Sequence, residues 1–314
     1  MPEIPDVVVY LERIEAKTRG ATLEAMRFAS PFVLRSFDPK PAELAGRRVV
    51  GYRRIGKRLV LGVEGDLFVV IHLMIAGRLR WSDAARDKIP GKVGLAAFDF
   101  ASASTPTGSG TLVLTEASTK KRASVHLVRG EAALADFDRG GVEPLAIDRA
   151  AFAAALRREN HTLKRTLTDP RLFSGIGNAY SDEILHRAKL SPVALSQKLD
   201  EAQIDRLYAA TRETLVSWTD ALRAEALASK LQWPDKVTAF REEMAVHGKY
   251  GKPCPVCGAP VQRIAYAENE TNYCATCQTG GKLLADRSLS RLLKDDWPKT
   301  IEELEERKST RGPA

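Results

Sequence analysis

The sequence is poor in cysteine and has no long hydrophobic run. Only four of its 314 residues are Cys, and all four lie between Cys254 and Cys277. Such clustering argues against a disulfide scaffold and favours one metal site. The largest apolar runs, such as residues 67–71, have the length of a strand and fall far short of the ~20 residues that a membrane helix needs. We therefore expect no membrane association.

A secretory leader is also not expected. Glu3, Asp6 and Glu12 interrupt the region in which the apolar part of a signal peptide would lie. We expect an intracellular protein on this ground.

Basic residues outnumber acidic residues in the sequence. The formal net charge is +8 and the isoelectric point is near 9.3. A basic protein suits a polyanionic partner, because each cation that neutralises a phosphate also releases a counterion. The excess alone does not identify nucleic acid, since many basic proteins bind none.

The hydrophobic pattern divides the chain into a β-rich half and a helical half. Residues 5–19 predict a helix, and short apolar segments separated by Gly, Pro and Asp then predict a β-sandwich or barrel-like sheet. These segments are 22–28, 48–55, 58–63, 66–71, 78–81, 94–100, 111–115 and 125–128. The predicted helices that follow are 149–158, 160–168, 179–188 and 200–226. Residues 227–250 are expected to form a helix-and-loop linker, and the charged residues 283–314 a short helix with a solvated tail.

Two C-x-x-C pairs form the strongest local motif. Cys254 and Cys257 make the first pair, Cys274 and Cys277 the second, and sixteen residues separate the pairs. This spacing lets four thiolates surround one tetrahedral Zn²⁺, with a β-hairpin between the pairs. A redox pair is the alternative, but two pairs without a thioredoxin-like βαβ context favour structural zinc.

The N-terminus carries a candidate nucleophile beside an acid. Removal of Met1 would leave Pro2 with a free secondary amine and Glu3 as its immediate neighbour. An α-amino group has a reference pKa near ~7.7–8.0, so the neutral amine can attack an electrophilic carbon and form an iminium. Sugar C1′ chemistry suits such a site. The alternative is a plain helix start, with Pro5 and Asp6 in the first turn.

Two further segments suit phosphate binding. Gly175 and Gly177 precede a predicted helix whose first residue, Asn178, can offer its amide to a phosphate oxygen. Asn178 could equally be a helix cap after a tight turn. Lys57 lies in a basic turn between two predicted strands, where a solvated turn is the simpler explanation.

Taken together, these segments resemble the formamidopyrimidine-DNA glycosylase and endonuclease VIII (Fpg/Nei) family from Pro2 to about Gln278. The matching stretches occur in one order: residues 2–5, 56–60, 72–80, 142–145, 163–164, 175–180 with Glu183, 247–253 and the four cysteines. The resemblance implies an α+β fold with an N-terminal β-sandwich, a helix-two-turn-helix domain and a C-terminal zinc-finger β-hairpin. We place the boundaries at 1–145, 146–250, 251–282 and 283–314, the last being a charged tail.

The resemblance also implies roles for single residues. Pro2 would attack C1′ of a damaged nucleoside flipped out of the stack, and Glu3 would act as general acid. Lys57 would bind a phosphate and assist β-elimination. Asn178 would hold a phosphate beside the lesion, and Lys164 would be a further basic residue facing DNA.

Several positions depart from the family pattern. Asn269 stands where the family has an Arg that clamps the lesion phosphate, so phosphate binding and δ-elimination should be weaker. Ile75 replaces a Met wedge with a stiffer apolar side chain. Residues 115–124 replace a stretch with an Arg and an intercalating Phe and contain no aromatic, although Lys120, Lys121 and Arg122 could supply cations. Asp6 replaces a Glu. The substrate is therefore expected to differ from an oxidised purine.

The leading hypothesis is a DNA repair glycosylase with abasic-site lyase activity, one structural Zn²⁺ and damaged or abasic DNA as partner. It is expected to act as a monomer in the cytoplasm, associated with the nucleoid. The alternative is a protein that binds damaged or abasic DNA with little or no turnover. Zinc-dependent RNA or ribosome binding would explain the charge and the zinc but leaves Pro2 and Glu3 without a role.

Overall fold

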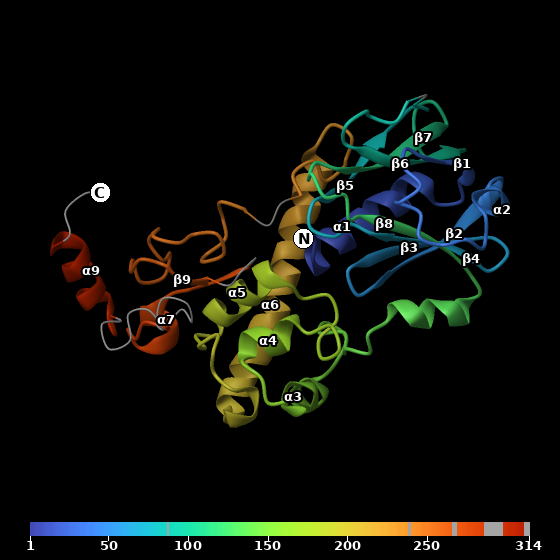
Figure 1. Cartoon of the computed structure of the whole chain (residues 1–314). Coiled ribbons are helices and arrows are strands. Elements are labelled where there is room, and N and C mark those ends of the chain that lie inside the picture. Colours follow the sequence, from blue (N-terminus) through green and yellow to red (C-terminus); the bar gives the residue numbers. More distant parts are fainter. Residues whose placement is uncertain (87, 238–239, 266–268, 286–297, 311–314) are drawn as a thin grey trace. The chain divides into compact units, whose positions relative to one another are not determined.

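The computed structural model describes residues 1–86, 88–237, 240–265, 269–285 and 298–310 (Figure 1). The chain forms two compact units. The first consists of Met1–Gly140 with Val216–Thr238, and the second of Gly141–Leu215 with Ala239–Ala314. Among the described residues, no helix combines the length and apolar character needed to span a bilayer.

The first unit begins with helix α1 (Ile4–Thr18). Glu3 is its N-cap, and the side chains of Glu3 and Asp6 form a reciprocal capping box. Pro5 in the first turn and the acid at Asp6 both favour a helix N-terminus. Its apolar face, which includes Tyr10 and Ile14, is buried in the core of the unit. The start of α1 therefore holds the N-terminal residues against the sheet.

The sheet of the first unit is a β-sandwich, as predicted. Its eight strands are β1 (Thr22–Phe28), β2 (Arg47–Ile55), β3 (Arg58–Val63), β4 (Leu67–His72), β5 (Gly77–Ser82), β6 (Gly94–Ala101), β7 (Ser109–Glu116) and β8 (Ser124–Arg129). Their order is β5-β7-β6-β1-β2-β3-β4-β8, and every neighbouring pair is antiparallel. Strands β1 and β2 share only the pairs Thr22–Arg48 and Leu23–Arg47. This narrow junction lets two four-stranded layers enclose one core.

Side chains alternate between the core and the outer face along β3, β4 and β8. Leu59 and Leu61 lie in the main core, whereas Val60 belongs to a smaller cluster under the 3₁₀ helix η1 (Glu131–Phe137). This two-residue period decides which polar residues of the same strands face outward. The unit also contains the short helix α2 (Pro41–Leu44).

Trp233, in the second stretch of the first unit (Val216–Thr238), belongs to a buried aromatic cluster of that unit. Trp233 is 1% exposed, its ring lies 5.8 Å from that of Tyr10 and 6.0 Å from that of Trp81, and its indole N–H donates to the carbonyl of Leu79. Buried aromatic contacts of this kind add to the stabilisation from apolar burial.

The second unit is mainly helical and contains a zinc-finger hairpin. Its elements are α3 (Arg149–Arg157), α4 (Leu163–Thr168), α5 (Asn178–Arg187), η2 (Ser196–Lys198), α6 (Glu201–Ala228), β9 (Gln262–Ala265), β10 (Glu270–Tyr273), α7 (Ala275–Thr279) and α9 (Ile301–Thr310). Helix α6 belongs to the second unit up to Leu215 and to the first from Val216. Strands β9 and β10 pair as the expected antiparallel hairpin.

Two expectations about local structure were wrong. The helix expected at 160–168 begins at Leu163, because Thr162 forms a β-bridge with Leu195. In the described part of 227–250, helix ends at Ala228 and the remainder is irregular. The short helix expected in the C-terminal segment is present as α9, and in addition Leu283 and Ile301 pack into an apolar cluster of the zinc finger. Residues 286–297 and 311–314 of that segment lie outside the described residues.

Candidate active site and metal centre

Glu3 is held rigidly at the start of α1. It is 2% exposed, its backbone N–H donates to Asp6 Oδ2 at 2.9 Å, and its carboxylate accepts the N–H of Asp6 in return. Pro2 is buried beside it. Asp6, noted in the sequence only as a shortened carboxylate, therefore positions the neighbouring acid. The geometry places an acid next to the position that carries the chain terminus once Met1 is removed.

The N-terminal amine lies among charged side chains of the first unit. In this structure the amine belongs to Met1, and burial lowers its pKa. Glu3 acts in the opposite direction, whereas Arg78 and, more weakly, Lys57 lower the pKa further. A lowered pKa increases the neutral fraction of an amine near pH 7, and neutral amine is the nucleophilic form. The structure thus brings Lys57 and Glu3 close enough to the N-terminal amine to act on its pKa.

Arg78 is a member of this group that sequence reasoning did not single out. Its guanidinium donates to the backbone carbonyls of Ile75 at 3.2 Å, Gly77 at 2.7 Å and Val237. These bonds fix the guanidinium, whose charge lowers the pKa of the N-terminal amine. The signal available in the sequence was the two-residue period of 78–81, which puts Arg78 and Arg80 on the face opposite Leu79 and Trp81.

Two predicted DNA-binding positions lie in turns of the first unit. Lys57 follows Gly56, whose φ of 59° turns the chain from β2 into β3. Ile75 lies in the turn between β4 and β5, and its side chain is 55% exposed. An exposed apolar side chain at a turn is available to contact a base, so its position is compatible with the predicted wedge.

The loop after β7 is organised by the buried carboxylate of Glu116, which sequence reasoning missed. Its Oε2 accepts the backbone N–H groups of Arg122 at 2.8 Å and Ala123 at 2.9 Å, and its Oε1 accepts the hydroxyl of Ser118 at 2.9 Å. Lys121 donates its ammonium to the carbonyl of Glu116. The predicted cations Lys120, Lys121 and Arg122 are all exposed. An acid directly after an apolar strand was the available signal.

In the second unit, Asn178 and Lys164 lie together but bond to protein groups. Asn178 Nδ2 donates to the carbonyl of Glu270 on β10 at 3.0 Å. Lys164 Nζ donates to the carbonyl of Asn178 at 2.6 Å and to Asp182 Oδ1 at 2.5 Å. Asp182 is fully buried and also contacts His247 Nδ1 at 2.7 Å. Lys164 therefore neutralises a buried acid that links α4, α5 and the loop at His247.

The zinc finger is attached to α5 through another buried acid. Glu183 accepts the backbone N–H groups of Ala245 at 2.8 Å and of Val246 and His247 at 2.9 Å each. Charged acceptors make strong hydrogen bonds with amide donors, so this carboxylate holds the chain that leads into the finger. Asn269 is exposed immediately before β10, and residues 266–268 before it lie outside the described residues.

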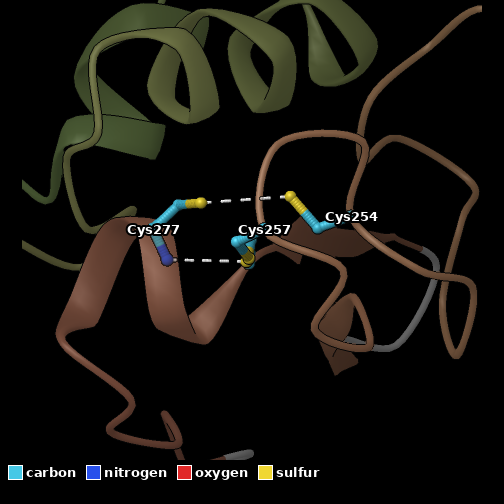
Figure 2. Close-up of side chains that lie close together, drawn as sticks. Cys254, Cys257 and Cys277 are labelled. Atoms are coloured by element: carbon cyan, nitrogen blue, oxygen red, sulfur yellow. Dashed lines mark hydrogen bonds between the residues drawn. The ribbon is translucent and has the colours of Figure 1, made fainter.

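The four cysteines form a metal site. Their sulfur atoms all lie within 4.8 Å of one another. The Sγ atoms of Cys254 and Cys277 are 3.9 Å apart, and those of Cys257 and Cys274 are 3.4 Å apart; Figure 2 shows three of these residues. Four sulfurs about 2.3 Å from a tetrahedral zinc ion would be separated by roughly 3.8 Å, so the donor set fits Zn²⁺. Four protein ligands leave no open position, which makes the site structural.

Comparison with known proteins agrees with this architecture along the chain. Residues 1–127 match the formamidopyrimidine-DNA glycosylase N-terminal domain, residues 141–231 the formamidopyrimidine-DNA glycosylase H2TH domain, and residues 251–280 the zinc finger found in FPG and IleRS.

Individual relatives and solved structures give the same result. A formamidopyrimidine-DNA glycosylase of Thermus thermophilus is 31% identical over 90% of this chain and 100% of its own. The corresponding protein of Variovorax paradoxus is 33% identical over 88% of this chain and 100% of its own. An uncharacterized formamidopyrimidine-DNA glycosylase-like protein of Mycobacterium tuberculosis is 42% identical over 49% of this chain and 94% of its own. The Lactococcus lactis Fpg, solved in complex with DNA that contains an abasic site, has a TM-score of 0.75 and 27% identity, covering 88% of this chain and 99% of its own.

The sandwich, the H2TH helices and the four-cysteine finger define the class of DNA repair glycosylases. Within that class, the chain belongs to the formamidopyrimidine-DNA glycosylase family. The predicted resemblance, fold class, enzyme class and structural zinc are thereby confirmed. The roles of the single site residues stay predictions.

Proposed function

We propose that this protein excises a damaged base from DNA and then cleaves the abasic strand, with the amine of Pro2 as nucleophile. The observation that carries this proposal is the start of the chain, where Pro2 is buried beside the buried carboxylate of Glu3. The terminal amine, which in this structure belongs to Met1, lies among Glu3, Arg78 and Lys57, and burial lowers its pKa. Removal of Met1 would put the secondary amine of Pro2 next to this fixed acid, which is the arrangement that covalent catalysis at a sugar carbon requires.

The proposed reaction proceeds through an iminium. After Met1 is removed, the Pro2 nitrogen attacks C1′ and the bond between C1′ and the damaged base breaks. Glu3 donates a proton to the sugar ring oxygen or to the departing base, and the opened sugar is held as an iminium on Pro2. Loss of a proton from C2′ then expels the 3′ phosphate, and Lys57 assists this step by binding phosphate. Water releases Pro2 from the product.

The remaining predicted residues would hold the DNA. We propose Asn178, Lys120, Lys121 and Arg122 as phosphate ligands and Ile75 as the wedge that fills the space left by the flipped base. Lys164 would act by keeping Asn178 in place, because its ammonium binds the Asn178 carbonyl. Asn269 offers a neutral amide in place of a charged fork, so strand cleavage should stop mainly at β-elimination.

Damaged or abasic DNA is accordingly the proposed partner, and we place the protein in the cytoplasm, on the DNA of the nucleoid.

One alternative function has support of its own. The neutral Asn269 and a loop at 115–124 without an aromatic side chain favour a protein that binds damaged DNA with little turnover.

Borohydride trapping distinguishes the two functions. The purified protein is incubated with duplex oligonucleotides carrying an abasic site or one of a panel of damaged bases, and the iminium is reduced to a stable adduct. We expect an adduct with the wild type and none with Pro2→Gly. Glu3→Gln should lose base excision by at least ~100-fold, the usual range for general acid catalysis. Tight binding without an adduct on any substrate would favour the damage-binding protein. Intact mass must first show that Met1 is removed.

A further inference from the structure

A second basic cluster lies on the outer face of the sandwich, beyond Lys57. It consists of Arg58 on β3, His72 on β4 and His126 on β8, with Arg35 and Arg139 nearby; all five belong to the first unit. None of the roles described above uses Arg58, His126, Arg35 or Arg139. We call these five residues the outer basic patch.

Strand register places three of the five residues of the patch on one face. Arg58 is paired with His72, and His72 with Ser124, while His126 lies two residues farther along β8. Residues two apart on a strand share a face, so Arg58, His72 and His126 point to the same side. The apolar cluster of Val60, Val70 and Val128 continues this face toward η1.

Phe137, the last residue of η1, contacts two residues of the patch, Arg58 and His126. The guanidinium carbon of Arg58 lies 5.7 Å from the centre of the Phe137 ring, and its Nη1 donates to the Phe137 carbonyl at 3.2 Å. The ring of His126 meets the same phenyl ring edge-on, with 5.1 Å between centroids. Arg58 and His126 are thus fixed around one aromatic side chain rather than dispersed in solvent.

The basic groups of the patch lower one another's pKa. Burial and then Arg58, Lys57 and His126 lower the pKa of His72 to about 4. Burial, Arg58 and Arg35 likewise lower the pKa of His126, and burial and Arg139 lower that of Arg58. Other arginines of the same unit have acids as partners: Arg53 pairs with Glu131, and Arg129 with Glu43 and Asp38. A bound anion would stabilise the positive charge of the arginines, and the His rings, which are mainly neutral near pH 7, would offer N–H donors to it.

We propose that the outer basic patch binds backbone phosphates of DNA next to those held at Lys57. Strands β3 and β8 are two strand spacings apart, roughly 10 Å, which suits consecutive phosphodiester groups of one strand better than a single small anion. The binding would be independent of sequence, because phosphate contacts position a protein without reading bases. This inference rests on the proposed function for its ligand.

Equilibrium binding of the full-length protein to a fluorescent abasic-site duplex, measured by anisotropy over a series of KCl concentrations, tests the proposal. Each lost phosphate contact should reduce the slope of log K against log salt by ~0.9 and weaken binding at 0.15 M salt by roughly fivefold. We expect this of Arg58→Gln. Arg58→Lys keeps the charge but not the planar fork, so it should retain the slope. His126→Phe keeps the ring contact with Phe137 and removes the N–H donors, so binding should weaken severalfold.

Arg129→Gln is the matched control, because it removes the same charge from the same sheet at a residue already paired with two acids. It should leave the slope and the activity unchanged. An Arg58→Gln slope equal to that of the control overturns the proposal, and a lower Tm with an unchanged slope shows that Arg58 only supports η1. Equal competition by inorganic phosphate and by DNA at matched ionic strength also overturns it, because the patch would then bind free phosphate.

The two proposals fail in different ways. Anisotropy does not require Pro2 chemistry, so the patch can be confirmed even if borohydride traps no adduct. A wild type that binds no DNA overturns both.

Discussion

At the scale of residues, His72 links pH to stability. Burial and three neighbouring basic groups lower its pKa to about 4, against 6.5 for an ordinary His. Below pH 6.5 the unfolded chain binds a proton that the folded protein does not, so folding stability rises with pH and falls on acidification. The loss begins near pH 6.5 and is complete near pH 4.

Replacing His72 with Gln should therefore flatten the decline in unfolding free energy between pH 7.5 and pH 5. At pH 5 the destabilisation that His72 contributes, and that the variant lacks, is at most about 2 kcal/mol and is reduced by the partial exposure of the ring. Urea unfolding of the wild type and of His72→Gln at both pH values measures this contribution. The titration of the carboxylates and cysteines is common to both proteins and cancels in the difference between their unfolding free energies. Two parallel pH curves would contradict the assignment of this term to His72.

Residue chemistry was predictable from the sequence where neighbours in sequence act together. Glu3 beside Pro2 and the paired cysteines are of this kind. The contacts of Glu183 and Asp182 were not, because these buried carboxylates bond to groups that only the fold brings near. Glu116 was missed although the partners of its carboxylate lie within seven residues. Spacing cannot reveal an acid whose partners lie more than 60 residues away, as those of Glu183 do.

At the scale of elements, helix α9 extends the core of the zinc finger. Ile301 is 8% exposed and packs with Ile264, Tyr273 and Leu283, while the hydroxyl of Tyr273 accepts the N–H of Leu284 at 2.7 Å. The match to the zinc-finger family ends at residue 280, before this segment begins. The C-terminal segment therefore adds apolar burial to the finger.

Ile301→Asp should weaken the finger, because it places a carboxylate without a designed partner in an apolar cluster. A local loss of about 2–3 kcal/mol corresponds to zinc release more than tenfold faster. The rate of transfer of zinc to a chromophoric chelator measures this. Glu302→Gln, at an exposed position of the same helix, is the control and should release zinc at the wild-type rate. Equal rates for the two variants would show that α9 does not support the finger.

Elements were predicted best where a glycine turn precedes an apolar segment. Strands β1 and β3 have the expected ranges, and Gly20 and Gly56, both with positive φ, turn the chain just before them. The start of α4 and the packing of α9 were missed, because a bridge between Thr162 and Leu195 and a cluster around Tyr273 are tertiary contacts. Local propensity does not contain such information.

At the scale of the whole molecule, the two units have separate means of stabilisation. The first has one large apolar core, in which Trp81 and Trp233 are buried, whereas the second contains the four-cysteine site. The metal and the large core therefore stabilise different parts of the chain.

Zinc removal should disorder the finger and leave the sandwich folded, because metal binding supplies folding free energy only where the ligands are. Hydrogen exchange read by mass spectrometry separates the two units along the chain. After treatment with a strong chelator, the amides of β9 and β10 should exchange roughly tenfold faster or more, as expected for local unfolding. Those of β3 and β4 should exchange at an unchanged rate, and added Zn²⁺ should restore the hairpin. Faster exchange in β3 and β4 as well would mean that loss of zinc also unfolds the first unit.

The bond from Asn178 Nδ2 to the carbonyl of Glu270 has a consequence for communication within the second unit. A primary amide has two hydrogens in one plane, and one of them is already committed to the hairpin. An anion at the start of α5 would take the other, and both acceptors would then orient the same rigid group. Binding of an anion at the start of α5 would therefore change the length of the hydrogen bond between Asn178 and Glu270 and so be transmitted to the hairpin.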